Sequence, residues 1–268
     1  MKKKTGYSIA GIIIAISIAA FIAIATFIVI DGNNKSTDFS SYDFNSVIQA
    51  DSHNGEISDH IKGYDPATGT VTDDPEIAKK APLIIYEYAD FQCEYCALMN
   101  TRVNNLIKKL EGKVSVVYRN YLLSYHQNGT AAASAAEAAS LQGYWKPYAD
   151  KLYENQSEWA YSTGSNRTDL FNRYFVEVTN GEGDLEKFNS DIASTNVSKK
   201  ISFDMGIGKR IDIAGTPAFY VDNQYIDFGN SNGGSLKIGN DTFTWEAALT
   251  SEQFDKLIED IANSKLSQ

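Results

Sequence analysis

The sequence predicts an α/β fold that contains a pair of parallel strands. A short apolar run at residues 83–88 (LIIYEY) is typical of a buried strand. Apolar residues at helical spacing over residues 93–110 predict an amphipathic helix, and residues 114–118 (VSVVY) predict a second strand. A strand, a helix and a strand within about 35 residues form a βαβ unit, whose two strands run parallel.

A helical region and then a ββα arrangement are predicted after this unit. The expected helices cover residues 130–142, 144–159, 168–178 and 185 to about 209. Strands are expected at residues 218–221 and 224–228, and their short connection makes them antiparallel. A small hairpin within residues 236–245 and a closing helix over residues 251–262, with Ser251 as its N-cap, complete the pattern.

The N-terminal residues predict a membrane anchor. Residues 8–30 carry no charge and follow three lysines, and a helix of about 23 residues can cross a hydrocarbon core of roughly 30 Å. A cleaved signal peptide is the alternative, but its apolar region is usually about 7–15 residues long. Because lysines favour the cytoplasmic side, we expect a single-pass protein of the cell membrane whose remaining residues are extracytoplasmic.

The expected organisation has four parts. Residues 1–7 form the cytoplasmic N-terminus and residues 8–30 the anchor, and residues 31–62 form an extracytoplasmic linker and lead-in. Residues 63–268 form the globular body, with a helical insertion at about 125–210. The net charge of −10 argues against nucleic acid as a partner, and two cysteines are too few for a disulfide-rich scaffold.

The two cysteines, Cys93 and Cys96, stand where the first predicted strand gives way to a helix. A structural disulfide between residues three apart would remove little entropy from the unfolded chain. A structural zinc site needs four ligands, and the three histidines of the chain lack the usual paired spacing, so no metal is expected. A redox dithiol remains, because a helix N-terminus favours a thiolate at Cys93, and Cys96 can attack a mixed disulfide formed there.

Two further features could belong to the same site. Thr216 and Pro217 precede a predicted strand, and a cis proline there could pack beside the dithiol and leave the Thr216 backbone free to pair with an extended substrate. Glu87 lies inside the apolar strand at residues 83–88, where it either faces outward or is a buried proton acceptor that helps to deprotonate Cys96. Arg119 is a possible partner of Glu87, or a surface charge.

Several segments together resemble the thioredoxin-fold proteins of the DsbA family. They are residues 88–96 (YADFQCEYC), 117–122 (VYRNYL), the Ala-rich helix running into 142–145 (QGYW), 214–222 (AGTPAFYVD) and the lead-in 54–63. The resemblance covers about 200 residues in the order of that family. It implies a thioredoxin fold (βαβ…ββα) with an inserted helical domain.

The resemblance also implies roles for individual residues. Cys93 matches the exposed nucleophile and Cys96 the buried resolving cysteine, Thr216 and Pro217 match a cis-proline loop, and Glu87 matches the carboxylate beneath the dithiol. Between the cysteines, Glu94 should oppose thiolate formation, so we expect a less oxidising couple than the strongest family members. Tyr95 either contacts substrate or covers the dithiol, and Glu94 beside it is expected to contact substrate as well.

The function implied by the resemblance is disulfide formation in exported proteins by a monomeric enzyme without a bound cofactor. Its partners would be exported proteins with free thiols and a membrane protein that reoxidises the dithiol. A reductase or isomerase that runs the exchange in the other direction is one alternative. A non-catalytic binding or chaperone protein of the same fold is the other.

Overall fold

The computed structural model describes residues 58–267. Its elements in chain order are β1 (His60–Asp65), β2 (Thr70–Thr72), α2 (Pro75–Ala78), β3 (Leu83–Ala89), α3 (Glu94–Lys109), β4 (Val114–Asn120), α4 (Gly129–Ser140), α5 (Trp145–Glu154), α6 (Gln156–Trp159), α7 (Gly164–Val178), α8 (Leu185–Ile192), α9 (Thr195–Arg210), β5 (Ala218–Val221), β6 (Gln224–Tyr225), β7 (Gly234–Ile238), β8 (Asp241–Trp245) and α10 (Ser251–Leu266). The predicted anchor and most of the linker lie outside the described residues. No helix within residues 58–267 is long and apolar enough to cross a membrane.

The central sheet has the strand order β2-β1-β4-β3-β5-β6. Strands β3 and β4 run parallel, as the βαβ pattern predicted, and β5 pairs antiparallel with both β3 and β6. The predicted hairpin is present as the separate pair β7-β8. Strands β1 and β2 were not predicted, because their sequences (HIKGYD and TVT) are short and have no apolar run.

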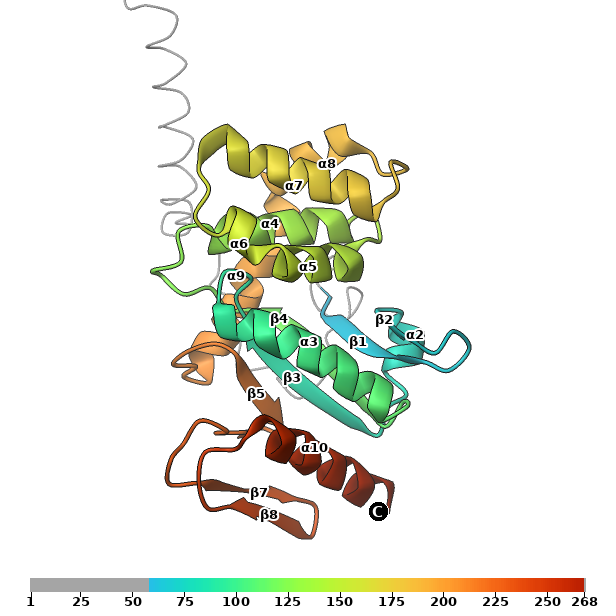
Figure 1. Cartoon of the computed structure of the whole chain (residues 1–268), viewed down its shortest axis with the longest axis vertical. Helices are drawn as coiled ribbons and strands as arrows, with labels where there is room; N and C mark the ends of the chain where they lie inside the picture. Colours follow the sequence, from blue (N-terminus) through green and yellow to red (C-terminus); the bar gives the residue numbers. More distant parts are fainter. Residues whose placement is uncertain (1–57, 268) are drawn as a thin grey trace, which may run out of the picture. The chain divides into compact units, whose positions relative to one another are not determined.

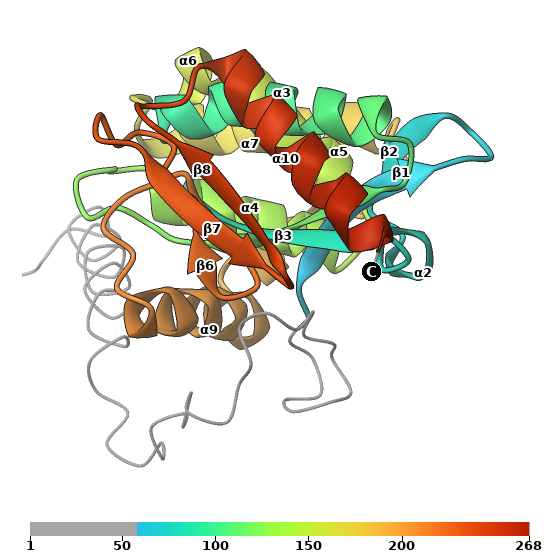
Figure 2. The ribbon, with the colours of Figure 1, turned by 90° about the horizontal axis from the view of Figure 1, so that it is seen from below.

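Helices cover both faces of the sheet. Figure 2 shows α3 and α10 on one side of the sheet and α9 on the other. Apolar side chains of β3, β4 and β5 pack against α3 and α10 in one buried cluster, to which β7 contributes Leu236 and Ile238. The strands therefore lie between two layers of helix, which explains the near-continuous apolar sequence of β3.

The helices between β4 and β5 form a second cluster (Figure 1), which also includes Phe91, Cys93 and Cys96 from the end of β3 and the start of α3. Helix α4 is alanine-rich, and its small side chains allow α5, α8 and α9 to pack closely around it. Aromatic rings fill the remaining space, and Phe175 stacks on Phe188 with ring centroids 4.2 Å apart.

Several predicted helix boundaries were wrong, among them the start of α7 at Gly164 and the end of α10 at Leu266. The expected helix 144–159 is divided at Asn155 into α5 and α6, and the expected helix 185–209 is divided into α8 and α9. The second break arises because the Ser194 side chain accepts a hydrogen bond from Val197 N and caps a new helix. The cap of α10 is Thr250 rather than Ser251, because Thr250 forms a capping box with Gln253.

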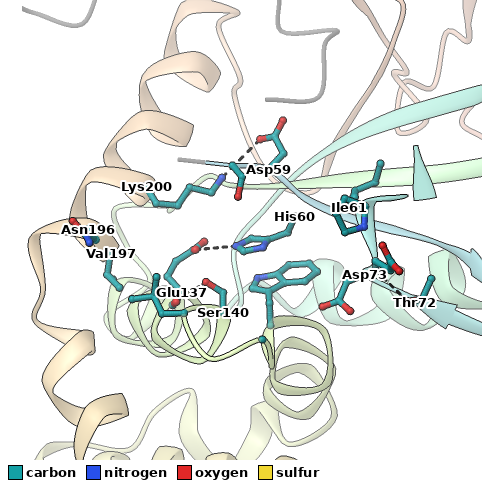
Figure 3. A pocket seen from close by; sticks show the side chains of 16 residues that line it. Asp59, His60, Ile61, Thr72, Asp73, Glu137, Ser140, Asn196, Val197 and Lys200 are labelled. Carbon is teal, nitrogen blue, oxygen red and sulfur yellow. Dashed lines mark hydrogen bonds and ion pairs between the residues drawn. The ribbon is translucent and has the colours of Figure 1, made fainter. Parts of the chain in front are cut away.

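A buried ion cluster joins the sheet to α4 and α9 beside a cavity of about 410 Å³. Figure 3 shows His60 directed at Glu137 and Lys200 at Asp59. The members of the cluster are His60, Glu137, Asn120, Asp204, Lys200, Asp59 and Arg119, which are linked by contacts of 2.6 to 3.8 Å. Since buried charges are costly unless paired, this cluster requires β1, β4, α4 and α9 to keep their relative positions.

The ion pair between Asp59 and Arg119 provides a test of this constraint. Both side chains are almost fully buried, and Arg119 Nη2 lies 2.7 Å from Asp59 Oδ2. Replacing Asp59 with Ala removes this partner from a buried guanidinium, so we expect the free energy of unfolding to fall by about 3 kcal/mol or more. Urea unfolding measures the loss. The matched control, Asp260→Ala, removes the exposed partner of Lys256 and should change stability little.

Candidate active site

Both cysteines lie at the start of α3, directly after the central strand β3. Cys93 is the N-cap residue of α3 and has extended backbone angles, and Cys96 lies in the first helical turn. The backbone N–H groups of Tyr95 and Cys96 bond to the Cys93 sulfur, as expected for the unpaired donors of a helix N-terminus. The strand therefore delivers Cys93 to a position where a negative charge is stabilised.

The Thr216–Pro217 peptide bond is cis, and it lies beside the dithiol as the cis-proline interpretation required. Cys93 Sγ donates a hydrogen bond to the Thr216 carbonyl at 3.3 Å. The thiol thus uses one lone pair of that carbonyl, and pairing of the Thr216 backbone with a substrate stays a prediction. Cys93 is also less open than the expected exposed nucleophile, with 5% of its surface exposed against 0% for Cys96.

The two thiols have opposite acidities. Hydrogen bonds from the Cys96 thiol, and then from the Thr216 side chain and the α3 backbone, lower the pKa of Cys93 from 9.0 to about 6, although burial opposes them. Burial, followed by the neighbouring Cys93, raises the pKa of Cys96 well above its ordinary value. At neutral pH the reduced site thus holds one thiolate and one thiol, the combination that nucleophilic exchange requires.

Glu87 lies beneath the dithiol and is 2% exposed, so the outward-facing interpretation was wrong. Burial raises the pKa of its carboxyl to about 7, partly opposed by the positive charge of Lys62. The suggested partnership with Arg119 was also wrong. Successive side chains alternate across a strand, and Arg119 bonds to the hydroxyl of Tyr88 on the opposite face from Glu87.

Sequence analysis missed Lys62, the buried cation that acts on Glu87. In the strand register, Lys62 and Ile85 both pair with Val116, so Lys62 shares the sheet face of Glu87 across β4. Its ammonium donates to Asn100 Oδ1 at 2.7 Å, and Asn100 donates in turn to Asp150 Oδ1 at 2.9 Å. No sequence signal could have identified Lys62, because a lysine in a short polar run resembles a surface residue.

The helical insertion also bonds to the turn that carries Cys93. Gln156 donates from Nε2 to the carbonyls of Phe91 and Cys93 at 2.7 and 3.0 Å. Gln92 donates from Nε2 to the Ala160 carbonyl at 2.8 Å. These contacts fix the backbone on both sides of the turn, so the insertion positions the nucleophile as well as covering it.

An open groove of about 870 Å³ lies next to the dithiol. Apolar and polar side chains of α3, the proline loop and the start of α10 line it, among them Tyr95, Leu98, Met99, Thr216, Pro217 and Phe228. Tyr95 is 71% exposed, so it is available to a bound molecule rather than serving as a cover. Glu94 is exposed in the first turn of α3 and does not line this groove.

Within residues 58–267 no group of three or more His, Cys, Asp or Glu side chains could hold a metal ion. Among the histidines in this range, His60 bonds to Glu137 and His126 to Asp90.

Replacing Cys96 with Ala tests the main cause of the low pKa of Cys93. The Cys96 thiol is the largest stabilising contact of the Cys93 thiolate, so its loss should raise the pKa of Cys93 from about 6 toward 9.0. The rate of iodoacetamide alkylation against pH measures this value. Cys93→Ala is the control for labelling elsewhere, and an unchanged midpoint in the Cys96→Ala variant would contradict the assignment.

Comparison with known proteins gives both a family and a fold. The thioredoxin family model matches residues 78–260. The Na(+)/H(+) antiporter NhaA 3 of Salinispora tropica is 31% identical over 148 residues, which are 54% of this chain and 21% of that protein. The chain thus spans about a fifth of the length of the curated relatives it matches, and the activity in their name belongs to those proteins.

Solved structures share the architecture at low sequence identity. The alpha-DsbA1 of Wolbachia pipientis aligns with a TM-score of 0.53 and 20% identity over 78% of this chain and 93% of its own. Oxidised BdbD from Bacillus subtilis aligns with a TM-score of 0.52 and 17% identity over 79% and 100%. At these identities the likeness establishes a thioredoxin fold that carries a helical insertion.

Proposed function

Because the chain belongs to the thioredoxin family, we propose that it is a thiol–disulfide oxidoreductase whose oxidised form donates the Cys93–Cys96 disulfide to other proteins. The observation that carries this proposal is the asymmetric pair of thiols. Cys93 is stabilised as a thiolate at the N-terminus of α3, and Cys96 is held as a buried thiol one turn away. A purely structural pair of cysteines has no need of this difference in acidity.

The exchange proceeds in two steps. A substrate thiolate attacks Cys93 of the oxidised pair, the Cys93–Cys96 bond breaks, and Cys96 leaves as a thiolate that takes up a proton. We assign the supply of that proton to Glu87, since its pKa of about 7 leaves much of the carboxyl protonated at neutral pH. A second substrate thiolate then attacks the substrate sulfur, which forms the substrate disulfide and releases Cys93 as a thiolate.

The low pKa of Cys93 favours the oxidising direction. A stabilised thiolate stabilises the reduced protein, so the disulfide is more readily given up. Cysteines of this kind have a pKa of about 7 in thioredoxin and about 3.5 in DsbA, and about 6 lies between them. The same value supports the reductase alternative, since it is closer to that of thioredoxin. The non-catalytic alternative has no specific support from the described residues.

The setting that we propose is extracytoplasmic. The uncharged residues 8–30 would anchor the protein in the cell membrane, and the acidic body would act on exported proteins with free thiols. A membrane protein that reoxidises the dithiol would complete the cycle, and the enzyme would work as a monomer without a bound cofactor. Tyr95 and Thr216, which line the groove beside Cys93, are the proposed substrate contacts, and exposed Glu94 adjoins them.

Trapping of mixed disulfides tests the exchange reaction itself. In the full chain, Cys96→Ala removes the resolving thiol, so a Cys93 thiolate that attacks a disulfide of a cellular protein stays joined to one of its sulfur atoms while the other leaves as a thiolate. These adducts should accumulate, and dithiothreitol should release them. Non-reducing electrophoresis of cells treated with acid measures these adducts. Cys93→Ala should abolish them. If the Cys96→Ala protein forms no adducts, the chain does not catalyse exchange.

The reduction potential of the dithiol tests the proposed direction. The intermediate pKa of Cys93 predicts a potential between about −270 mV, the value for thioredoxin, and about −120 mV, the value for DsbA. Equilibration with glutathione buffers, followed by alkylation of the remaining thiols, gives this potential. A value near −120 mV would contradict the expectation of a weaker oxidant. A value near −270 mV, with the protein reduced when isolated from cells, would favour the reductase.

A further inference from the structure

Asp90 begins the turn between β3 and Cys93, and its carboxylate is fully buried. Oδ1 accepts a hydrogen bond from Gln92 N at 2.8 Å. Oδ2 accepts one from Leu123 N and another from the ring of His126, both at 2.9 Å. A carboxylate can only accept, so His126 Nδ1 is the donor in this contact.

The backbone of Asp90 contacts both cysteines. Its carbonyl accepts from Cys93 N at 3.0 Å. Its N–H bonds to the sulfur of Cys96 and lowers the pKa of that thiol, against the larger effect of burial. Asp90 therefore forms hydrogen bonds to the loop before α4 through its side chain, and to the two cysteines through its main chain.

The enclosure around Asp90 is tight. A Cβ added at Gly129 would lie 2.8 Å from Asp90 Oδ1, so the first residue of α4 has to lack a side chain. Among the described side chains that bond to this carboxylate, only His126 can carry a positive charge. Its side chain is 15% exposed and belongs to the loop between β4 and α4, which the βαβ unit does not need.

We propose that His126 is a positioning residue for the exchange reaction. Its ring holds the Asp90 carboxylate, and through the Asp90 backbone it fixes the hydrogen bonds that reach Cys93 and Cys96. The role in exchange rests on the proposed function, whereas the effect on the Cys93 thiol does not. The helical insertion would then act on the dithiol through one side-chain contact in addition to the backbone contacts of Gln156.

The direction of the effect follows from electrostatics. Without His126, the buried Asp90 carboxylate loses a donor, so its negative charge is less compensated at the turn that also carries Cys93. The turn is also freer to move, so the donors that meet the cysteines are less well placed. Both changes disfavour the thiolate, so the pH midpoint of Cys93 alkylation should rise.

The test compares three substitutions in the full chain. In His126→Asn the amide nitrogen is as many bonds from Cα as Nδ1, so it can donate to Asp90. In His126→Gln the same amide is one methylene farther out, and in His126→Ala the donor is absent. Gln127→Ala, at the next and exposed residue of the loop, is the control that should leave the midpoint unchanged.

We expect the pH midpoint of Cys93 alkylation to rise by about half a unit or more in His126→Ala and His126→Gln. At a given pH below the midpoint, the fraction of Cys93 thiolate would then fall about threefold. His126→Asn should restore the wild-type midpoint. Urea unfolding of each variant measures its stability separately from the alkylation midpoint. If His126→Ala does not fold, the comparison of the Asn and Gln variants tests the proposal. A midpoint that is the same in the Asn and Gln variants would overturn the proposal, whether or not stability changes.

Insulin reduction by the wild-type protein and by these variants separates the two proposals. If the wild-type protein shows no exchange while the midpoint still shifts with His126, the proposed function fails and the contact to the dithiol stands. If exchange is present and its rate does not follow the midpoint among the variants, His126 does not act on the reaction.

Discussion

The Cys93 thiolate depends on donors that no single element of the fold can supply. The N-terminus of α3 provides backbone N–H groups and the Cys96 thiol, and the loop before β5 brings the Thr216 side chain to the sulfur. These groups meet because β3 is central in the sheet, with β4 on one side and β5 on the other. The order of the strands is therefore as necessary to the chemistry as the Cys-Glu-Tyr-Cys sequence.

Buried charge on both faces of the sheet ties the helical insertion to this arrangement. On the α3 face, Lys62 faces the Glu87 carboxyl and is held by Asn100 and through it by Asp150 of α5. On the other face, Asp59 pairs with Arg119 and also faces Lys200 of α9, which belongs to the insertion. A buried charge without its partner costs several kcal/mol, so movement of the insertion would break contacts on two faces at once. The insertion thus helps to define the active site.

The sequence predicts what is local and leaves open what is distant. The spacing of apolar residues was sufficient to predict β3, α3 and β4, and it also placed Cys93 at the start of a helix. The face of Glu87 could not be decided, because both faces of a central strand are buried and no alternation remains. For the same reason Arg119 was left as either a partner of Glu87 or a surface charge, and both interpretations were wrong, because it is buried and pairs with Asp59. Lys62 and His126 act through contacts with residues 36 or more positions away, and periodicity carries no such information.

The two shifted acids make the stability of the reduced protein depend on pH in opposite directions. Cys93 has a pKa of about 6 when folded and 9.0 ordinarily, so its stabilising contribution is complete above pH 9 and is lost as the pH falls through 6. Glu87 has a pKa of about 7 when folded and 4.5 ordinarily, so its contribution is complete below 4.5 and is lost as the pH rises through 7. The oxidised protein has no Cys93 thiolate and lacks the first contribution. Raising the pH from 6 to 9 therefore makes reduction of the Cys93–Cys96 disulfide more favourable, compared with reduction of a disulfide between thiols of ordinary pKa. A protein that donates its disulfide works best under that condition.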